Sequence, residues 1–336
     1  MQDFKQQKER VRQLFNDMEK ANASNIASVF AQHMDNDYLV YACYPFNQLT
    51  GLAAAMDNIW QPLFQSFSFL ERREDIFMAG QNENSDEVWV MSMGHFMGLF
   101  DEDWLGMRAT KKSTLLRYAE FHCVKDDKII KSSFFVDLIG FMQQIGLQPL
   151  PVQTGANFIC PGPKTHDGLL FSPQAPEESD YTLQIVNRMV DDLSALNISG
   201  NDDCPPELLS ECWHDNMAWF GPGGIGSVHS ILRYQQQHQF PFRKGLKDKV
   251  FNGHVCRFAE GNYACFFGWP NLTNTPTGGF LGLPGAKLRG DMRVVDIYRR
   301  EGDKLAENWV IMDIPYWLKQ QGLDILERTV SISNPN

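Results

Sequence analysis

The chain has 336 residues, is 43% hydrophobic and 12% aromatic, and carries a formal net charge of -11. This length suits two packed domains better than one. The acidic balance argues against nucleic acid, whose recognition needs a basic surface, and against an anionic membrane surface. The charged N-terminus has no apolar signal segment, and no stretch approaches the roughly 20 apolar residues of a membrane span. We therefore expect a cytoplasmic protein with neither a nucleic-acid nor a membrane partner.

The spacing of cysteine and histidine gives no sign of a metal site or a disulfide framework. The seven cysteines are odd in number, and neither CxxC nor HExxH occurs. We expect mostly reduced, buried thiols, no metal ion and no other cofactor.

The first half of the chain is predicted to form helices and then strands. Apolar residues recur at helical spacing near the N-terminus, and period-two or continuous apolar segments follow later. In chain order, the predicted elements are helices over 4–18 and 52–67 and strands over 87–97, 113–124 and 129–139. The next segment, 148–179, is rich in Pro and Gly and is predicted to be a linker. Its apolar residues indicate that it docks on a domain: Phe158, Ile159, Leu169, Leu170 and Phe171.

The second half repeats this order. The predicted helices cover 183–196, 205–214 and 227–237, and the predicted strands cover 247–261, 262–272, 291–302 and 304–314. Helices followed by antiparallel strands with short turns indicate the α+β class. A bent sheet that wraps a few helices would enclose an apolar interior in each half.

The two halves are related by an internal repeat with an offset of 176 residues. Ten of the 44 aligned positions are identical between 104–147 and 280–323, and Asp137 falls on Asp313. Chance would give about one identity in fifteen or twenty positions for ordinary compositions. One domain has therefore been copied: we assign copy one, the diverged copy, to 1–147 and copy two to 180–330. The copies could pack as an intramolecular pseudo-dimer, and a homo-oligomer is also possible.

Copy two carries a series of motifs that occur together: EGNYACFFGW (260–269), TGGFLGLPG (277–285), DIYRREG (296–302) and ENWVIMD (307–313). In this order they resemble the SnoaL-like polyketide cyclase family, within the nuclear transport factor 2-like superfamily. Copy one has Lys131 and Ser133 where copy two has Glu307 and Trp309. The resemblance implies two tandem cone-shaped α+β barrels, each a curved mixed or antiparallel sheet wrapped around N-terminal helices, with one pocket per copy.

The resemblance also implies a function: cofactor-independent acid/base chemistry of the polyketide or ester cyclase type on a small hydrophobic carbonyl compound. Family members use a buried aspartate, which corresponds to Asp313 and, in copy one, to Asp137. One alternative is epoxide hydrolysis or isomerisation on the same fold, for which Asp291, Arg293 and Asp296 supply the residue types. Another is a non-catalytic protein that binds a small molecule or acts as a scaffold.

Three roles for Asp313 are open from the sequence. Alternation in a strand places Trp309, Ile311 and Asp313 on one face. If that face points into the pocket, burial raises the pKa of the carboxyl and makes it a usable acid or base near neutrality. Asp313 could instead cap the helix that starts near Pro315, or hydrogen-bond a ligand. Because Glu307 and Trp309 occur in copy two alone, we expect any surviving chemistry near them.

Further candidates line the predicted strands. Asp296 alternates with Tyr298 and could face the pocket, although a cross-strand ion pair with Arg257 or Arg299 is the alternative. His254, His95 and His122 could exchange protons or bind substrate, or could be hydrogen-bonded structural residues. Three aromatic residues could form a pocket wall or an ordinary core: Trp219, Trp269 and Phe280.

Overall fold

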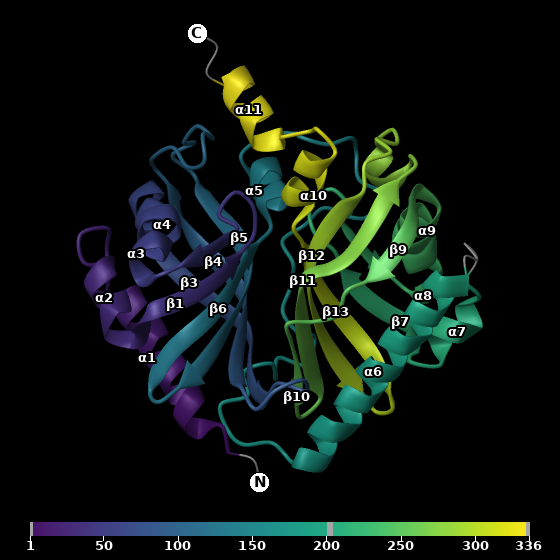
Figure 1. Cartoon of the computed structure of the whole chain (residues 1–336), viewed down its shortest axis with the longest axis horizontal. Helices are drawn as coiled ribbons and strands as arrows, with labels where there is room; N and C mark the ends of the chain where they lie inside the picture. The colour runs from purple at the N-terminus through teal and green to yellow at the C-terminus, as the bar shows by residue number, and fades with distance from the viewer. Residues whose placement is uncertain (1–2, 200–203, 334–336) are drawn as a thin grey trace.

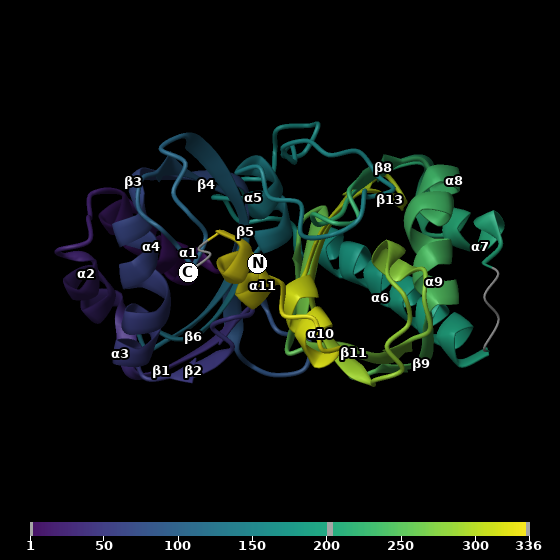
Figure 2. The same cartoon turned by 90° about the horizontal axis from the view of Figure 1, so that it is seen from above.

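The computed structural model describes residues 3–199 and 204–333. It confirms the α+β class: one six-stranded and one seven-stranded mixed sheet lie between two outer sets of helices, with the sheets facing one another (Figure 1). Within the described ranges, no helix is long and apolar enough to cross a membrane. The view from above shows the same two halves side by side (Figure 2).

In the first half, helices pack against one face of a sheet ordered β2-β1-β6-β5-β4-β3, in which only β1 and β6 are parallel neighbours. Its elements are α1 (Lys5–Glu19), α2 (Ile26–His33), β1 (Met34–Ala42), β2 (Gln48–Thr50), α3 (Leu52–Ala55), a π-helical turn (Met56–Trp60), α4 (Gln61–Ser66), β3 (Phe67–Gln81), β4 (Val88–Phe100), β5 (Ser113–Lys125), β6 (Lys128–Val136) and α5 (Leu138–Gln144).

The second half repeats this topology in the order β10-β11-β12-β13-β7-β8, with β9 also paired to β11. Its elements are α6 (Pro176–Ser199), α7 (Pro206–Ser210), β7 (Trp213–Phe220), β8 (Ser227–His229), α8 (Ile231–Tyr234), a π-helical turn (Gln235–Gln239), α9 (Phe240–Gly245), β9 (Leu246–Phe251), β10 (Cys256–Glu260), β11 (Tyr263–Pro276), a 3-10 turn (Phe280–Gly282), β12 (Gly290–Glu301), β13 (Lys304–Met312), α10 (Ile314–Gln320) and α11 (Ile325–Ser333).

Three local predictions were wrong. The helix expected over 227–237 begins only at Ile231, and Ser227–His229 form the strand β8, which pairs with β7. The helix expected over 205–214 ends at Ser210, and Trp213 begins β7, which pairs in parallel with the distant strand β13. That pairing joins residues far apart in the sequence, so local pattern could not reveal it. The single strand expected over 247–261 is two strands, β9 and β10, separated by 252–255. This break matters because it places His254 outside the regular ladder.

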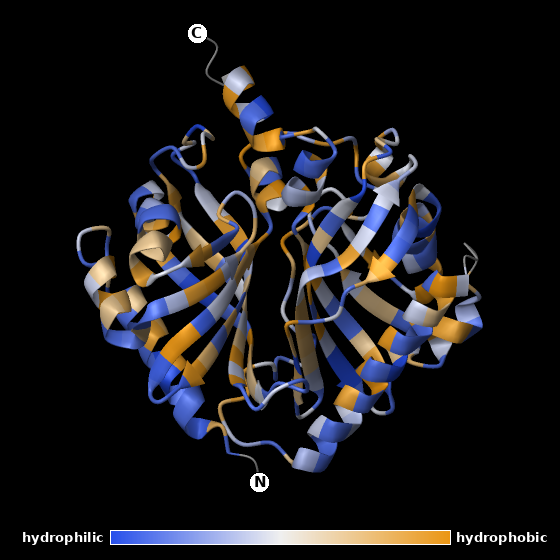
Figure 3. Ribbon diagram, in the orientation of Figure 1, coloured by the Kyte–Doolittle hydropathy of each residue, from blue (hydrophilic) through white to orange (hydrophobic). Residues whose placement is uncertain are grey.

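Aromatic side chains join the two sheets. Phe267 of β11 contacts the rings of Trp89, Phe121 and Phe135 from copy one, at centroid distances of 5.7, 5.0 and 6.2 Å. Apolar and polar residues are interspersed along the strands (Figure 3), as expected of strands with two different faces. The buried hydrophobic residues of both halves consequently form one continuous cluster. All seven cysteines are unpaired, and all except Cys160 are buried.

Candidate functional site

The structure places Asp313 at a helix start and not on a cavity wall. Its carboxylate accepts hydrogen bonds from the backbone N–H of Tyr316, at 3.3 Å, and from Nη1 of Arg293, at 3.3 Å. A third donor comes from copy one: the backbone N–H of Tyr44, at 2.9 Å. Burial raises the pKa of Asp313 to about 6, while Arg293 and the two backbone donors oppose that rise. The residue caps α10 and ties it to the other copy.

Asp137 makes the equivalent contacts from copy one to copy two. It accepts from the backbone N–H of Gly140 in its own helix, at 2.9 Å, and from the backbone N–H of Gly223 in copy two, at 2.8 Å. We call Asp137 and Asp313 the reciprocal caps. Each satisfies orphan donors at a helix N-terminus and one donor across the seam between the copies. Their recurrence in both copies is explained by this contact without invoking chemistry.

The face of β13 that points into copy two is the opposite of the one expected. Asn308, Val310 and Met312 line the interior cavity, whereas Trp309 is fully buried on the other side. Alternation fixes which residues share a face, but it does not say which face turns inward. Asp313 follows the last residue of the strand and turns toward the seam.

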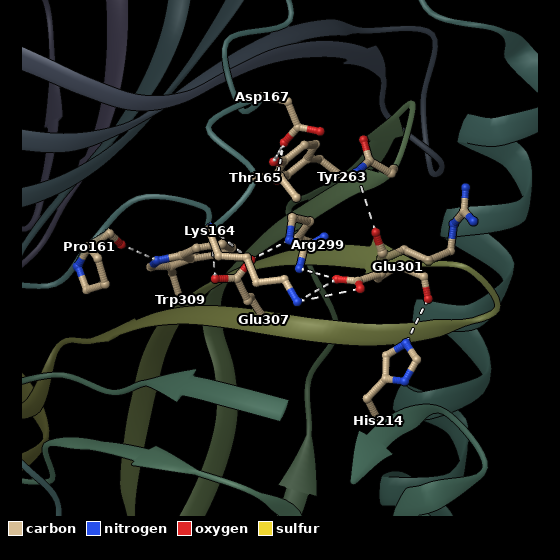
Figure 4. A network of polar contacts seen from close by, with 12 residues as sticks. Pro161, Lys164, Thr165, Asp167, His214, Tyr263, Arg299, Glu301, Glu307 and Trp309 are labelled. Carbon is tan, nitrogen blue, oxygen red and sulfur yellow. Dashed lines mark hydrogen bonds and ion pairs between the residues drawn. The ribbon is translucent and has the colours of Figure 1, made fainter. Parts of the chain in front are cut away.

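Glu307 and Trp309 anchor the linker (Figure 4). Trp309 Nε1 donates to the carbonyl oxygen of Pro161 at 2.9 Å, and its ring stacks on Phe220. Glu307 accepts from the backbone N–H of Lys164 at 3.2 Å and pairs with Arg299. The residues that distinguish copy two in this strand therefore hold the linker, and the expectation of chemistry beside them stays a prediction.

This anchor gives a testable prediction. Replacing Glu307 by alanine should speed tryptic cleavage after Lys164 by at least about tenfold, because a hydrogen bond to a charged group contributes about 1.5–3 kcal/mol. Cleavage is followed by mass spectrometry under native conditions. The control is Glu301→Ala, which removes the exposed side-chain partner of Lys164 and one partner of Arg299 but leaves Glu307 bound to the backbone N–H of Lys164. Equal rates for the two variants would contradict the role assigned to Glu307.

The interior of copy two encloses a cavity of about 180 Å³. It lies between α6, the π-helical turn before α9 and the inner faces of β7, β11, β12 and β13. The polar and aromatic residues of its wall include Trp213, Trp219, Tyr234, His238, His254, Phe266, Asp296, Tyr298 and Asn308. Four of the sequence candidates thus meet there: Trp219, His254, Asp296 and Tyr298.

Asp296 is the carboxylate of this cavity. It accepts hydrogen bonds from Tyr298 Oη at 3.1 Å and from Asn308 Nδ2 at 3.2 Å. Burial raises its pKa to about 6, and these two donors only partly offset that effect. The alternative ion pairs do not form, because Arg257 contacts Glu83 and Arg299 contacts Glu307. Asp296 is therefore a carboxyl poised near neutrality without a cationic partner among the described residues.

Two neutral histidines share the cavity wall with Asp296. His254 stacks on Phe266 with 3.8 Å between ring centroids, and His238 stacks on Trp219 with 4.2 Å. Burial lowers the pKa of each to about 3, so both imidazoles are uncharged at neutral pH. The Nδ1 atom of each is buried and has no hydrogen-bond partner among the described residues. Each can donate to or accept from a bound molecule.

His238 escaped the sequence reasoning. It follows Tyr234 by four residues within a glutamine-rich segment, so helical spacing places both on one face. That spacing was the available signal.

Two other aromatic candidates lie elsewhere. Trp269 packs against Tyr41 of copy one at the seam, with a 5.7 Å centroid distance. Phe280 contacts Phe242 and Trp317 outside the wall of the copy-two cavity.

The interior of copy one holds an ion pair where copy two holds Asp296. The offset of 176 aligns Glu120 with Asp296, and Glu120 lies 2.5 Å from Nη1 of Arg72. Arg72 lies opposite Phe96 in the sheet of copy one. Phe96 aligns with Leu272 of copy two, which lies opposite Phe251. Phe251 therefore occupies in copy two the position of Arg72. Burial opposes ionisation of Glu120, but Arg72 and His122 together outweigh that effect and the pKa is lowered.

The two histidine candidates of copy one lie beside polar side chains of their own half. His122 Nδ1 is 2.8 Å from Ser132 Oγ, and its Nε2 is 3.7 Å from Glu120. His95 Nδ1 is 3.5 Å from Asp75, and His95 lines a separate cavity at the seam. Neither histidine belongs to the copy-two cavity.

The ion pair of copy one predicts a large stability effect. Arg72→Met should lower the free energy of unfolding by about 3–5 kcal/mol, because Glu120 is left buried and unpaired. The double variant Arg72→Met, Glu120→Gln should recover most of that loss. Urea denaturation of the three proteins checks both statements, and the pairing is refuted if the double variant is no more stable than Arg72→Met alone.

The residues expected for epoxide hydrolysis do not converge. Asp291 accepts from Thr273 Oγ1 at 2.6 Å, Arg293 contacts Asp313 at the seam, and only Asp296 reaches the cavity. No arginine joins two acids among these three. These three residues of β12 therefore lie in different environments although they are close in sequence.

No family model and no curated protein matches the sequence. The chain is similar in structure to SnoaL-like polyketide cyclases and NTF2-like proteins. Each of these solved structures covers about 42% of the chain.

Three of these structures illustrate the range. One from Jannaschia sp., assigned as a SnoaL-like polyketide cyclase, is 21% identical and covers 43% of this chain and 94% of its own, with a TM-score of 0.36. IdmH from Streptomyces antibioticus, assigned as a polyketide cyclase, is 14% identical and covers 42% and 99%, with a TM-score of 0.33. An LEH-like epoxide hydrolase from M. tuberculosis is 11% identical and covers 47% and 99%, with a TM-score of 0.30. At these identities the likeness concerns the fold alone.

Proposed function

We propose that the copy-two cavity is the active site of an acid/base enzyme that acts on a small hydrophobic carbonyl compound, with Asp296 as the proton-transferring group. The observation that carries the proposal is a carboxyl in the wall of an apolar cavity whose pKa is raised to about 6, with no cation paired to it among the described residues. A general acid or base works best when its pKa lies near the working pH.

The chemistry is a proton abstraction beside a carbonyl group. Ionised Asp296 takes a proton from the α-carbon, and the electron pair of the broken C–H bond moves to the carbonyl oxygen. A neutral imidazole, from His254 or His238, donates a hydrogen bond to that oxygen as charge develops. The resulting enolate either regains the proton at another carbon or attacks a second carbonyl group of the same molecule. In either case Asp296 returns its proton to the product, so no cofactor is required for the balance.

The size of the cavity limits the substrate. A protein cavity of about 150 Å³ holds benzene, so the 180 Å³ cavity suits a molecule built on about one ring. This favours a monocyclic ketone, enone or lactone over a polycyclic polyketide. The flat rings of Trp219 and Phe266 suit such a molecule.

Binding without turnover is the second candidate. It is favoured by copy one, in which the fold persists although its interior acid is paired with Arg72. A thermal-shift screen of monocyclic ketones, enones and lactones separates the two. Ligands should stabilise both wild type and Asp296→Asn, and wild type alone should convert them, as followed by NMR. Ligands that bind both proteins and are converted by neither would leave binding as the function.

A further inference from the structure

A second cavity, of about 230 Å³, lies at the seam between the copies. Its wall combines β5 and α5 of copy one, the loop 221–227 of copy two and residues 156–160 of the linker. It shares no residue with the wall of the copy-two cavity. We call it the seam cavity.

The repeat shows why this cavity is open. Arg117 aligns with Arg293, whose guanidinium lies between two rings, 3.7 Å from the centroid of Trp269 and 3.4 Å from that of Tyr316. Above Arg117, the position of Tyr316 is taken by Gly140, which lines the seam cavity. The space that an aromatic ring fills in one half of the seam is therefore free in the other half.

The second ring above Arg293 is also replaced. In copy one, Gly94 lies opposite Tyr118, and in copy two Gly268 lies opposite Val294, the residue that aligns with Tyr118. Gly94 therefore corresponds to Gly268. The next residue is His95 in copy one and Trp269 in copy two. His95 interacts with Asp75 and lines the seam cavity without stacking on Arg117. Both aromatic covers are thus missing on the copy-one side.

Arg117, a residue of the cavity wall, has an unused donor. It is 5% exposed, and its Nη1 and Nη2 donate to the carbonyl oxygens of Gly221 and Phe220 at 3.1 and 3.0 Å. Its Nε is buried and has no hydrogen-bond partner among the described residues. A buried charged group with an unpaired N–H is energetically unfavourable, and a bound acceptor would relieve that cost.

Gln143 presents an unused acceptor. Its Nε2 donates to Oε1 of Gln153 at 3.1 Å, and that same oxygen accepts from the backbone N–H of Gly224 at 3.1 Å. This network fixes which end of Gln143 is the oxygen. The Oε1 atom is buried and has no partner in the described part of the chain. The seam cavity therefore offers one free donor and one free acceptor.

We propose that the seam cavity is a second binding site, which takes a small uncharged aromatic carboxamide. The amide oxygen would accept from Arg117 Nε, and the amide N–H would donate to Gln143 Oε1. Leu115, Phe141 and Phe158 supply an apolar wall for the ring. A carboxylate fits less well, because it would turn an oxygen toward the Gln143 oxygen, and because a carboxylate, Asp137, already lies on the same wall.

The test measures binding of benzamide and benzoate by calorimetry to the full chain. Benzamide should bind at least tenfold more tightly than benzoate. Arg117→Lys and Gln143→Met should each weaken benzamide binding by at least tenfold. The matched controls are Arg293→Lys, the counterpart across the repeat, and Asp296→Asn in the other cavity, and both should bind benzamide as wild type does.

Gln143→Met leaves the contacts of Arg117 across the seam intact, so it tests the site even if Arg117→Lys does not fold. The proposal is overturned if benzamide shows no saturable binding, if benzoate binds as tightly, or if Gln143→Met binds benzamide as wild type does. Loss of binding in Asp296→Asn with retention in Gln143→Met would place benzamide in the copy-two cavity and would equally overturn it.

Discussion

Replacing Asp313 by alanine is expected to lower the free energy of unfolding by about 3–5 kcal/mol. The change removes the cap of α10 and leaves Arg293 buried beside the seam without its carboxylate. It also strips the backbone N–H of Tyr44 of its acceptor. Urea denaturation at neutral pH measures the loss. Because the contact joins the two copies, both copies should unfold at a lower urea concentration than in wild type.

Matched variants separate the parts of this effect. Asp313→Asn keeps an oxygen that can cap the helix, so its loss should be smaller than that of Asp313→Ala. Asp137→Ala should cost about 1–3 kcal/mol, since it leaves the N–H groups of Gly140 and Gly223 unsatisfied but unpairs no cation among the described residues. A loss below about 1 kcal/mol for Asp313→Ala would contradict the account of the reciprocal caps.

Replacing Asp296 by asparagine is expected to reduce turnover by about 10²- to 10⁴-fold, the range in which general acid–base groups contribute. The variant should fold, because asparagine has the same shape and can still contact Tyr298 and Asn308. Conversion of a ligand from the screen, followed by NMR at fixed pH, measures the loss. The control is Asp291→Asn, on the same strand but outside the cavity.

The same substitution should make the protein more stable at neutral and alkaline pH. Folding raises the pKa of Asp296 from 3.8 to about 6, so the folded state holds this proton more tightly than the unfolded state. The contribution of the group to stability is therefore complete below about pH 4 and is lost as the pH rises through 6. Asp296→Asn has no such loss, so its advantage over wild type should grow from near zero at pH 4 to about 1–3 kcal/mol at pH 8.

Much of the architecture could be predicted from the sequence, because it depends on local pattern. The helical stripe near the N-terminus and the later apolar segments correspond to α1 and to the strands from β4 to β6 and from β11 to β13. The parallel strands β1 and β7 could not be predicted, since their partners β6 and β13 lie about ninety residues away along the chain and no local signal marks that pairing.

The site could be predicted only in part, because the sequence does not say which face of each strand points into the interior. Alternation correctly grouped Asp296 with Tyr298, and separately Trp309 with Asp313, but it left open which group faces the interior. Trp309 was expected to face a pocket, but its indole N–H donates to the linker carbonyl of Pro161. Long-range contacts of this kind have no trace in a single strand.

The recurrence of aspartate at 137 and 313 was the better clue to their role. A residue that is kept in both copies of a duplication while the interior diverges is more readily explained by a contact between the copies. The interiors did diverge: Arg72 and Glu120 pair in one copy, while Phe251 and Asp296 line a cavity in the other.

The central claim is that any chemistry resides with Asp296 inside copy two and not with the repeated aspartates at the seam. The most direct test compares kcat/KM of Asp296→Asn and Asp313→Asn, side by side, for a compound that wild type converts, at a temperature where both variants are folded. We predict that Asp296→Asn loses at least a hundredfold while Asp313→Asn stays within a few fold of wild type. Loss of turnover in Asp313→Asn with retention in Asp296→Asn would contradict the account.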